Sequence, residues 1–157
     1  MSGVEAENER VEGAAQASAP AREDYAYALA VPTRWLDNDA HGHVNNVEYY
    51  SFFDTVVTTW LIVEAGHDVR AAPVIGVCIE SHCTFHAALT FPEVIDARMR
   101  VGQIGRTSVR YEVALFADDG GPCAATGHFV HVYVDRDGRR PTPVPEALRA
   151  ELELCRR

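Results

Sequence analysis

One long apolar pattern with helical spacing constrains this chain more than any other feature. Apolar side chains recur every three or four residues and stop before Gly66, a residue typical of helix C-termini. These positions are Tyr49, Phe52, Phe53, Val56, Val57, Trp60, Leu61 and Val63. The pattern predicts a helix that begins near residues 44–46 and runs to about Ala65. Its Val-Val-Thr-Thr run at residues 56–59 has modest helix propensity, so tertiary burial must stabilise it.

Five other segments alternate between apolar and other side chains, which is typical of half-buried strands. They span residues 25–31, 74–87, 94–104, 108–116 and 123–134. Gly105 and Arg106 look like a two-residue hairpin turn, and short reversals of this kind make successive strands antiparallel. Residues 145–155 add a short helix with Pro145 in its first turn. We therefore predict an α+β domain in which an antiparallel five-stranded sheet wraps around one long central helix.

Length and charge favour one domain that does not bind nucleic acid. A chain of 157 residues with 47% hydrophobic residues can bury one core and leaves little room for a second. Residues 1–22 contain no aromatic residue and no apolar run, so we predict a disordered tail before a single domain at residues 23–157. The net charge is −9, and the 14 basic residues form no obvious cluster that would bind phosphates.

The sequence offers no signal for export, membrane insertion or metal binding. The first residues lack the basic start and apolar middle of a signal peptide, and no later segment offers about 18 uncharged apolar residues. We expect a cytoplasmic protein without a membrane partner. The four cysteines form no C-x-x-C pair, which favours reduced thiols over a disulfide framework. His41 and His43 lack further ligands at suitable spacing, so we predict no metal site.

Two acids, two histidines and two asparagines lie directly before the predicted helix. Asp37 and Asp39 are followed closely by His43, Asn45 and Asn46. A carboxylate such as Asp39 can act as a base or nucleophile. The first N–H groups of a helix lack partners within the helix and can bind a developing anion. A loop that combines both groups is suited to acyl transfer.

The motif D-x-D-x-x-G-H-V-N-N-x-x-Y at residues 37–49, with the order of elements over residues 25–134, resembles the hot-dog-fold thioesterases. The likeness is greatest to the 4-hydroxybenzoyl-CoA thioesterase-like acyl-CoA hydrolases. The H-V-N-N-x-x-Y part, with Arg34 and the two acids before it, is also similar to the acyl-ACP thioesterases of plants and bacteria. The resemblance implies a hot-dog fold and hydrolysis of an acyl thioester to a free acid and a thiol.

The same resemblance implies roles within the motif. Asp39 matches the catalytic acid, which acts as a nucleophile or as a base for water, although a loop aspartate can instead close an Asx turn or cap a helix. Asn46 stands where a backbone N–H binds the thioester oxygen, and relatives often carry Tyr or His there. His43 and Asn45 match residues implicated in catalysis by the acyl-ACP thioesterases. Asp37 would orient the loop or His43, or only cap it.

Substrate and partners follow from the resemblance as well. Arg106 and Arg110 would bind the phosphates of CoA, or would be solvated surface charges. CoA enters as part of the substrate, acyl-ACP is the alternative carrier, and no separate cofactor is expected. Hot-dog domains usually pair so that the active site lies at the boundary, which implies a homodimer or homotetramer. The same fold also occurs in non-catalytic acyl-CoA-binding proteins and in dehydratases, and both functions stay open at this point. The helix aromatics would line an acyl tunnel or, more commonly, form the core.

Overall fold

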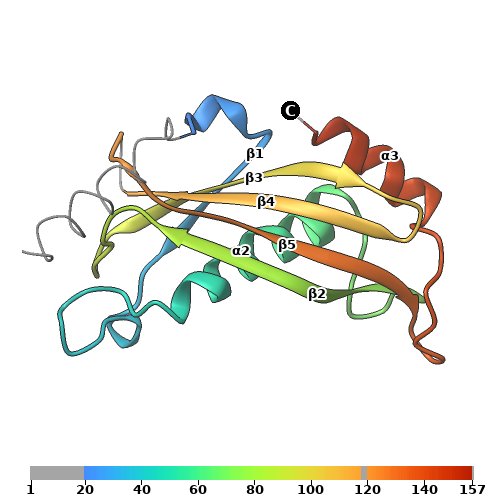
Figure 1. Cartoon of the computed structure of the whole chain (residues 1–157), viewed down its shortest axis with the longest axis horizontal. Coiled ribbons are helices and arrows are strands. Elements are labelled where there is room, and N and C mark those ends of the chain that lie inside the picture. The colour runs from blue at the N-terminus through green and yellow to red at the C-terminus, as the bar shows by residue number, and fades with distance from the viewer. Residues whose placement is uncertain (1–19, 118–119, 157) are drawn as a thin grey trace, which may run out of the picture.

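The computed structural model describes residues 20–117 and 120–156, which form a five-stranded antiparallel sheet with a helix against one face (Figure 1). The elements in chain order are η1 (Arg22–Asp24), β1 (Tyr27–Pro32), η2 (Trp35–Asp37), α2 (Glu48–Thr59), η3 (Trp60–Glu64), β2 (Val74–Phe85), β3 (Val94–Ile104), β4 (Ser108–Phe116), β5 (Cys123–Asp135) and α3 (Glu146–Leu154). The strand order across the sheet is β1-β3-β4-β5-β2. This arrangement confirms the predicted α+β class.

The hairpin between β3 and β4 turns one residue later than predicted. The Gly105 N–H donates to the Ser108 carbonyl at 2.7 Å, so the two turn residues are Arg106 and Thr107. Gly105 itself belongs to the paired part of the hairpin. A Cβ added there would lie 2.7 Å from the Ser108 Oγ, so this glycine allows a close approach between strands rather than making the turn.

The central helix consists of α2 and a wider π-helical turn, η3, and it begins later than predicted. The Asn45 carbonyl accepts a hydrogen bond from the Glu48 N–H at 3.0 Å, and the Asn45 side-chain oxygen accepts one from the Val47 N–H at 3.2 Å. These bonds hold residues 45–47 in a turn, so the regular helix starts at Glu48 rather than near residues 44–46. At the other end Gly66 adopts a φ of +65°, which favours glycine.

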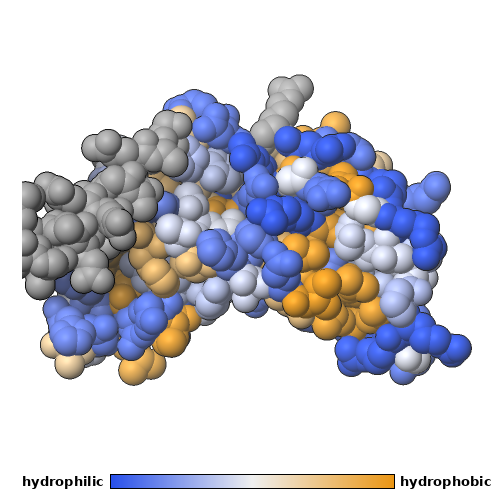
Figure 2. All heavy atoms as spheres, in the orientation of Figure 1, coloured by the Kyte–Doolittle hydropathy of each residue, from blue (hydrophilic) through white to orange (hydrophobic). Residues whose placement is uncertain are grey.

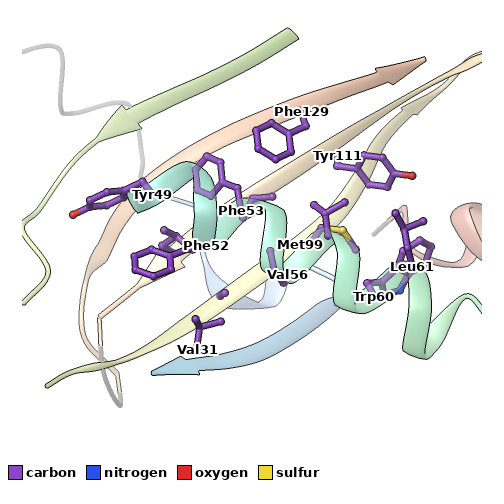
Figure 3. Packing of buried hydrophobic residues seen from close by; sticks show 14 of the residues in the cluster. Val31, Tyr49, Phe52, Phe53, Val56, Trp60, Leu61, Met99, Tyr111 and Phe129 are labelled. Atoms are coloured by element: carbon purple, nitrogen blue, oxygen red, sulfur yellow. The ribbon is translucent and has the colours of Figure 1, made fainter. Parts of the chain in front are cut away.

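The aromatic side chains of the central helix form the core beneath the sheet (Figure 3). Tyr49, Phe52, Phe53 and Trp60 are 0–5% exposed. The helix packs mainly against β3 and β1. The Phe53 ring also lies against Gly127 of β5, and a Cβ added to Gly127 would overlap this ring. The stripe therefore fills the core, as the more common of the two predictions required, and Tyr49 also lines a pocket at the start of the helix.

The opposite face of the sheet carries rows of charged and imidazole side chains. Arg100 and Arg110 both bond to Glu112, with nitrogen to oxygen distances of 2.7 and 3.3 Å. The His128 Nε2 lies 2.6 Å from a carboxylate oxygen of Glu80. Figure 2 shows hydrophilic residues over the middle of the molecule and a hydrophobic patch beside them. The cations on this face are thus paired with acids within the same chain.

Strand β2 forms one edge of the sheet and is half-exposed or exposed along its whole length. It pairs only with β5, and a bulge interrupts the register between Cys78 and Glu80. On one side of the bulge Cys78 lies opposite the buried His131, and on the other side His82 lies opposite His128. The bulge therefore reverses which face of the sheet the side chains of β2 occupy.

Most of the predicted tail, residues 1–19, lies outside the described residues. Its last member, Arg22, bonds to the Asp96 carboxylate at 2.9 Å and to the carbonyls of Ala117 and Gly121 at 3.1 and 2.9 Å. Its guanidinium also lies 4.4 Å from the centre of the Phe116 ring. Arg22 is thus part of the folded unit.

All four cysteines are free, and Cys123 and Cys155 are buried. Within the described ranges, no helix has both the length and the apolar character needed to cross a membrane.

Candidate active site

The polar motif forms a closed loop between η2 and α2. An isolated β-bridge joins Asn38 to Val44 across the loop. Inside it, the Asp39 N–H donates to the His43 carbonyl at 2.9 Å, and the Gly42 N–H donates to the Asp39 carbonyl at 3.1 Å. Gly42 has a φ of +79°, a left-handed conformation that favours glycine. The residues of the motif are therefore held in a defined turn.

Asp37 forms the buried base of this loop. Its carboxylate is fully buried and accepts hydrogen bonds from the Arg34 N–H at 2.7 Å, Nε at 3.0 Å and Nη2 at 2.6 Å. The Asp37 carbonyl also accepts the Asn45 N–H at 2.8 Å. Asp37 orients the loop, as one of its predicted roles required. Among the described residues its side chain does not bond to His43.

Asp39 lies nearer the tip of the loop and is half-buried. Its Oδ1 accepts the His41 N–H at 2.8 Å, which closes an Asx turn. Its Oδ2 has no hydrogen-bond partner within the described ranges. The side chain lines an open pocket of about 290 Å³ together with Trp35, Leu36, Asn38 and Gly42. One oxygen is thus structural, and the other is available to a ligand.

A second pocket, of about 360 Å³, opens at the start of the central helix. It is lined by His43, Val44, Asn46, Tyr49, Phe85, His86, Ala87 and Ala88. The Asn46 N–H donates to no acceptor in the described part of the chain, whereas the next two amides both bond to Asn45. The structure therefore brings His43 and Asn46 together, and places Asp39 in the other pocket.

Phe85 and His86 line this second pocket and were not among the site residues predicted from the sequence. Phe85 packs edge-on against Tyr49, with ring centres 4.9 Å apart, and the His86 Nε2 lies 2.8 Å from the Thr126 Oγ. Burial raises the pKa of the Tyr49 hydroxyl, and its contact with the Leu89 backbone opposes part of this effect. Tyr49 is thus a neutral wall of the pocket. Phe85 and His86 lie far from the motif in sequence. The sequence indicated only that they lie near the end of a predicted strand.

The two predicted CoA-binding arginines lie away from both pockets. Arg106 is exposed in the β3–β4 turn, whereas the start of β3 pairs with Pro32 next to the motif loop (Figure 1). The eleven residues of β3 separate these two ends by about 34 Å. Arg110 points to the outer face, where it bonds to Glu112 and its Nη2 lies 3.0 Å from the His128 Nδ1. No group of three candidate metal ligands gathers anywhere in the described residues.

Comparison with known proteins places the chain in a family. The model of the thioesterase-like superfamily matches residues 33–152. The solved structure of the PA5185 protein from Pseudomonas aeruginosa strain PAO1 is similar, with 44% identity, a TM-score of 0.84, and coverage of 87% of this chain and 96% of that one. A thioesterase from Thermus thermophilus, complexed with coenzyme A and Zn, has 25% identity and a TM-score of 0.71 over 82% of this chain and 98% of that one.

More distant structures share the fold. A 1,4-dihydroxy-2-naphthoyl-CoA thioesterase from Synechocystis has 12% identity and a TM-score of 0.72, over 80% of this chain and 94% of that one. A search of curated proteins gives no match. The superfamily match includes the motif loop, the central helix and strands β2 to β5. This chain therefore belongs to the thioesterase-like superfamily, and it is a thioester hydrolase with the hot-dog fold.

Proposed function

We propose that this protein hydrolyses acyl-CoA, with the thioester carbonyl bound at the Asn46 N–H. The observation that carries the proposal is this amide, which has no acceptor among the described residues and belongs to a residue that lines a pocket at the start of the helix. Amides at helix starts carry positive partial charge and stabilise the oxyanion that forms when a carbonyl carbon becomes tetrahedral. The complex of the Thermus thermophilus relative with coenzyme A supports CoA as the carrier.

Asp39 supplies the carboxylate in either of two routes. In the first, its Oδ2 attacks the acyl carbon, the CoA thiolate leaves, and water hydrolyses the mixed anhydride to the free acid and Asp39. In the second, Asp39 takes a proton from a water molecule as that water attacks, and the tetrahedral intermediate then expels the thiolate. Both routes require the acyl carbon to lie between the Asp39 pocket and the Asn46 pocket, along the segment of Gly42 and His43.

The other predicted residues have supporting parts in this proposal. His43 contacts the thioester because it lines the same pocket as Asn46. Asn45 fixes the position of the helix start, since its side-chain oxygen holds the Val47 N–H. Arg106 and Arg110 reach the CoA phosphates only if they come from another copy of the chain, given their distance from both pockets.

A homodimer or homotetramer is part of the proposal for the same reason. Strand β2 is an edge strand of twelve residues, and its outward backbone groups pair with no strand in the described part of this chain. Long exposed edges favour pairing with another strand. A second copy paired along β2 would extend the sheet and would bring additional side chains to the pocket that includes Phe85 and His86, at the end of that strand.

The test is thiol release from a panel of acyl-CoAs by the wild-type protein, Asp39→Asn and the control Asp68→Asn. Asp68 is also a loop aspartate, but its carboxylate pairs with Arg70 outside both pockets. We expect turnover by wild type and by Asp68→Asn, and a loss of about 10²-fold or more in Asp39→Asn. Activity that survives in Asp39→Asn would show that another group is the catalytic carboxylate.

The carrier is tested in the same assay. If wild type releases thiol from acyl-ACP and from no acyl-CoA, the carrier is acyl-ACP and the CoA part of the proposal is wrong. If it binds acyl-CoA without releasing thiol from either carrier, the chain is an acyl-CoA-binding protein. Light scattering at several protein concentrations measures the oligomeric state, and a monomer throughout would contradict the dimer or tetramer.

A further inference from the structure

Two of the most exposed large apolar side chains in the described residues are neighbours on η2. Trp35 is 74% exposed and Leu36 is 79% exposed, whereas the aromatic residues of the central helix are mostly buried. Figure 2 shows hydrophobic atoms at the surface of the motif-loop end of the molecule. Exposed apolar clusters of this kind mark binding sites more often than scattered single residues do.

The exposure of this pair is fixed by the fold. The turn that presents both residues is closed by the three hydrogen bonds from Arg34 to the buried Asp37 carboxylate. The Trp35 ring also packs edge-on against Phe91, with ring centres 5.8 Å apart and planes at 75°. The indole is thus held on one edge while most of its surface stays open. We call this pair the Trp35–Leu36 platform.

The platform and Asp39 line the same pocket. Its walls are Trp35, Leu36, Asn38, Asp39 and Gly42, and its volume is about 290 Å³. Asn38 is anchored because its Oδ1 accepts the Phe91 N–H at 3.1 Å. Asn38 and Asp39 are thus the polar side chains of a pocket whose large side chains are apolar, and Asp39 keeps one oxygen without a partner among the described residues. A cavity of about 150 Å³ is enough to hold a benzene ring, so this one can hold a benzoyl-sized group.

Most aromatic side chains of the central helix are packed in the core, so a ligand would have to displace them. Tyr49 also lines the Asn46 pocket, which the proposed function assigns to the thioester carbonyl. We propose that the Trp35–Leu36 platform binds the apolar end of the acyl group and so determines which acyl groups are hydrolysed. This inference rests on the proposed function, because it takes Asp39 as the carboxylate beside the reacting carbon.

The kinetic test compares kcat/KM for benzoyl-CoA with that for acetyl-CoA, whose acyl group is too short to cover the platform. The variants are Trp35→Ala, Leu36→Ala, Trp35→Phe and the control Leu154→Ala. Leu154 matches Leu36 because it is 74% exposed, but it lies on α3. We expect the benzoyl-to-acetyl ratio to fall about tenfold or more in Trp35→Ala, to fall less in Leu36→Ala, and to be largely kept in Trp35→Phe. Leu154→Ala should match wild type.

A binding test does not depend on turnover. The chain has two tryptophans, of which Trp60 is 5% exposed and Trp35 is the exposed one. In Asp39→Asn, benzoyl-CoA should shift the tryptophan emission to shorter wavelength, whereas free CoA should not. The shift should be absent when Trp35→Phe is added to Asp39→Asn.

Each outcome separates the two proposals. An emission shift without turnover in wild type would support the platform as a binding site for the acyl group and would overturn the hydrolysis of acyl-CoA. Turnover in wild type with an unchanged benzoyl-to-acetyl ratio in Trp35→Ala would overturn the platform alone. A smaller oligomer in Trp35→Ala and Leu36→Ala, with the ratio unchanged, would show that the pair contacts a second copy of the chain and would also overturn it.

Discussion

The base and the tip of the motif loop differ in how their polar groups are hydrogen-bonded. At the base, the Asp37 carboxylate is buried and accepts three hydrogen bonds from Arg34. Nearer the tip, Asp39 has one bonded and one free oxygen, and at the start of the central helix the Asn46 N–H is free among the described residues. A fully bonded group stabilises a loop but offers nothing to a ligand. The bonded base therefore makes it possible to hold unbonded groups in place near the tip and at the helix start.

The largest effect is expected from removing the free amide at the start of the central helix. Asn46→Pro removes the N–H, and proline is tolerated near the start of a helix. We expect kcat for acyl-CoA hydrolysis to fall about 10²- to 10³-fold, as when one oxyanion donor is lost. Asn46→Ala keeps the N–H and should retain most of the activity. Equal losses in the two variants would mean that the side chain of Asn46, and not its amide, is required.

A smaller effect, on stability, is expected at the base. Asp37→Ala leaves the Arg34 N–H without its acceptor and leaves the guanidinium with Glu48, whose Oε2 lies 3.5 Å from the Arg34 Nη2, as its remaining acidic partner. Because the Arg34 side chain is 63% exposed, water also replaces part of the interaction, and we expect a loss of about 2 kcal/mol in the free energy of unfolding. Urea denaturation measures the loss. Asp39→Ala removes one such bond, to the His41 N–H, and should cost less, about 1 kcal/mol. A larger loss for Asp39→Ala than for Asp37→Ala would show that the tip of the loop, and not its base, contributes more to stability.

Asn45 connects the base of the loop to the start of the helix, and variants at this position distinguish a capping role from a catalytic one. Asn45→Ala removes the acceptor for the Val47 N–H and should cost about 1 kcal/mol in the free energy of unfolding. Asn45→Asp keeps an acceptor and should restore that stability. Thermal unfolding and thiol release are measured on both variants. Loss of activity in Asn45→Asp with stability restored would show that the amide group of Asn45 acts on the substrate.

The smallest effect is expected on the pH dependence of stability, and it comes from a polar group inside the core. The His131 Nδ1 is buried without a hydrogen-bond partner among the described residues, and its ring packs against those of Phe129 and Tyr111. Burial lowers its pKa from the usual 6.5, and Asp54 opposes part of this effect. The unfolded chain therefore binds a proton more readily, and stability falls as the pH drops below 6.5 towards the folded pKa.

The test is the pH dependence of unfolding in wild type and His131→Phe. One such group changes stability by at most about 1.4 kcal/mol per pH unit, and His131→Phe should remove its share of the acid slope. His67 has a pKa lowered in the same direction and stays in both proteins. An unchanged slope in His131→Phe would contradict the prediction.

Much of the fold could be predicted because the alternation in its strands is regular. Strands β3 and β4 begin and end at the predicted residues, since their alternate positions are consistently apolar. The order of strands in the sheet could not be predicted, because alternation defines a buried face and not a neighbour. The bulge in β2 could not be predicted from the sequence either. Strict alternation puts Cys78 and His82 on one face, whereas the bulge puts them on opposite faces.

The site was predicted in part, because motif residues that are close in sequence need not line one cavity. The pattern before the helix marked the loop, and His43 and Asn46 do share a pocket. The pocket of Asp39 is a different one, because the loop turns at Gly42 between them. The charge of Arg110 predicts phosphate binding, but its side chain bonds to Glu112 on the outer face. Such a partner two residues along a strand depends on side-chain conformation, which composition does not reveal.

The π-helical turn at the end of the central helix bears on how the family can vary in length. Its hydrogen bonds span one residue more than those of an α-helix, so a turn of this kind accommodates a single inserted residue. In this chain the turn is Trp60–Glu64, where Trp60 and Leu61 stay buried while Val63 is 66% exposed. A relative that lacks one residue here can continue a regular α-helix and keep the same core contacts upstream. A single-residue deletion in this turn should therefore leave the motif loop at the other end of the helix unchanged.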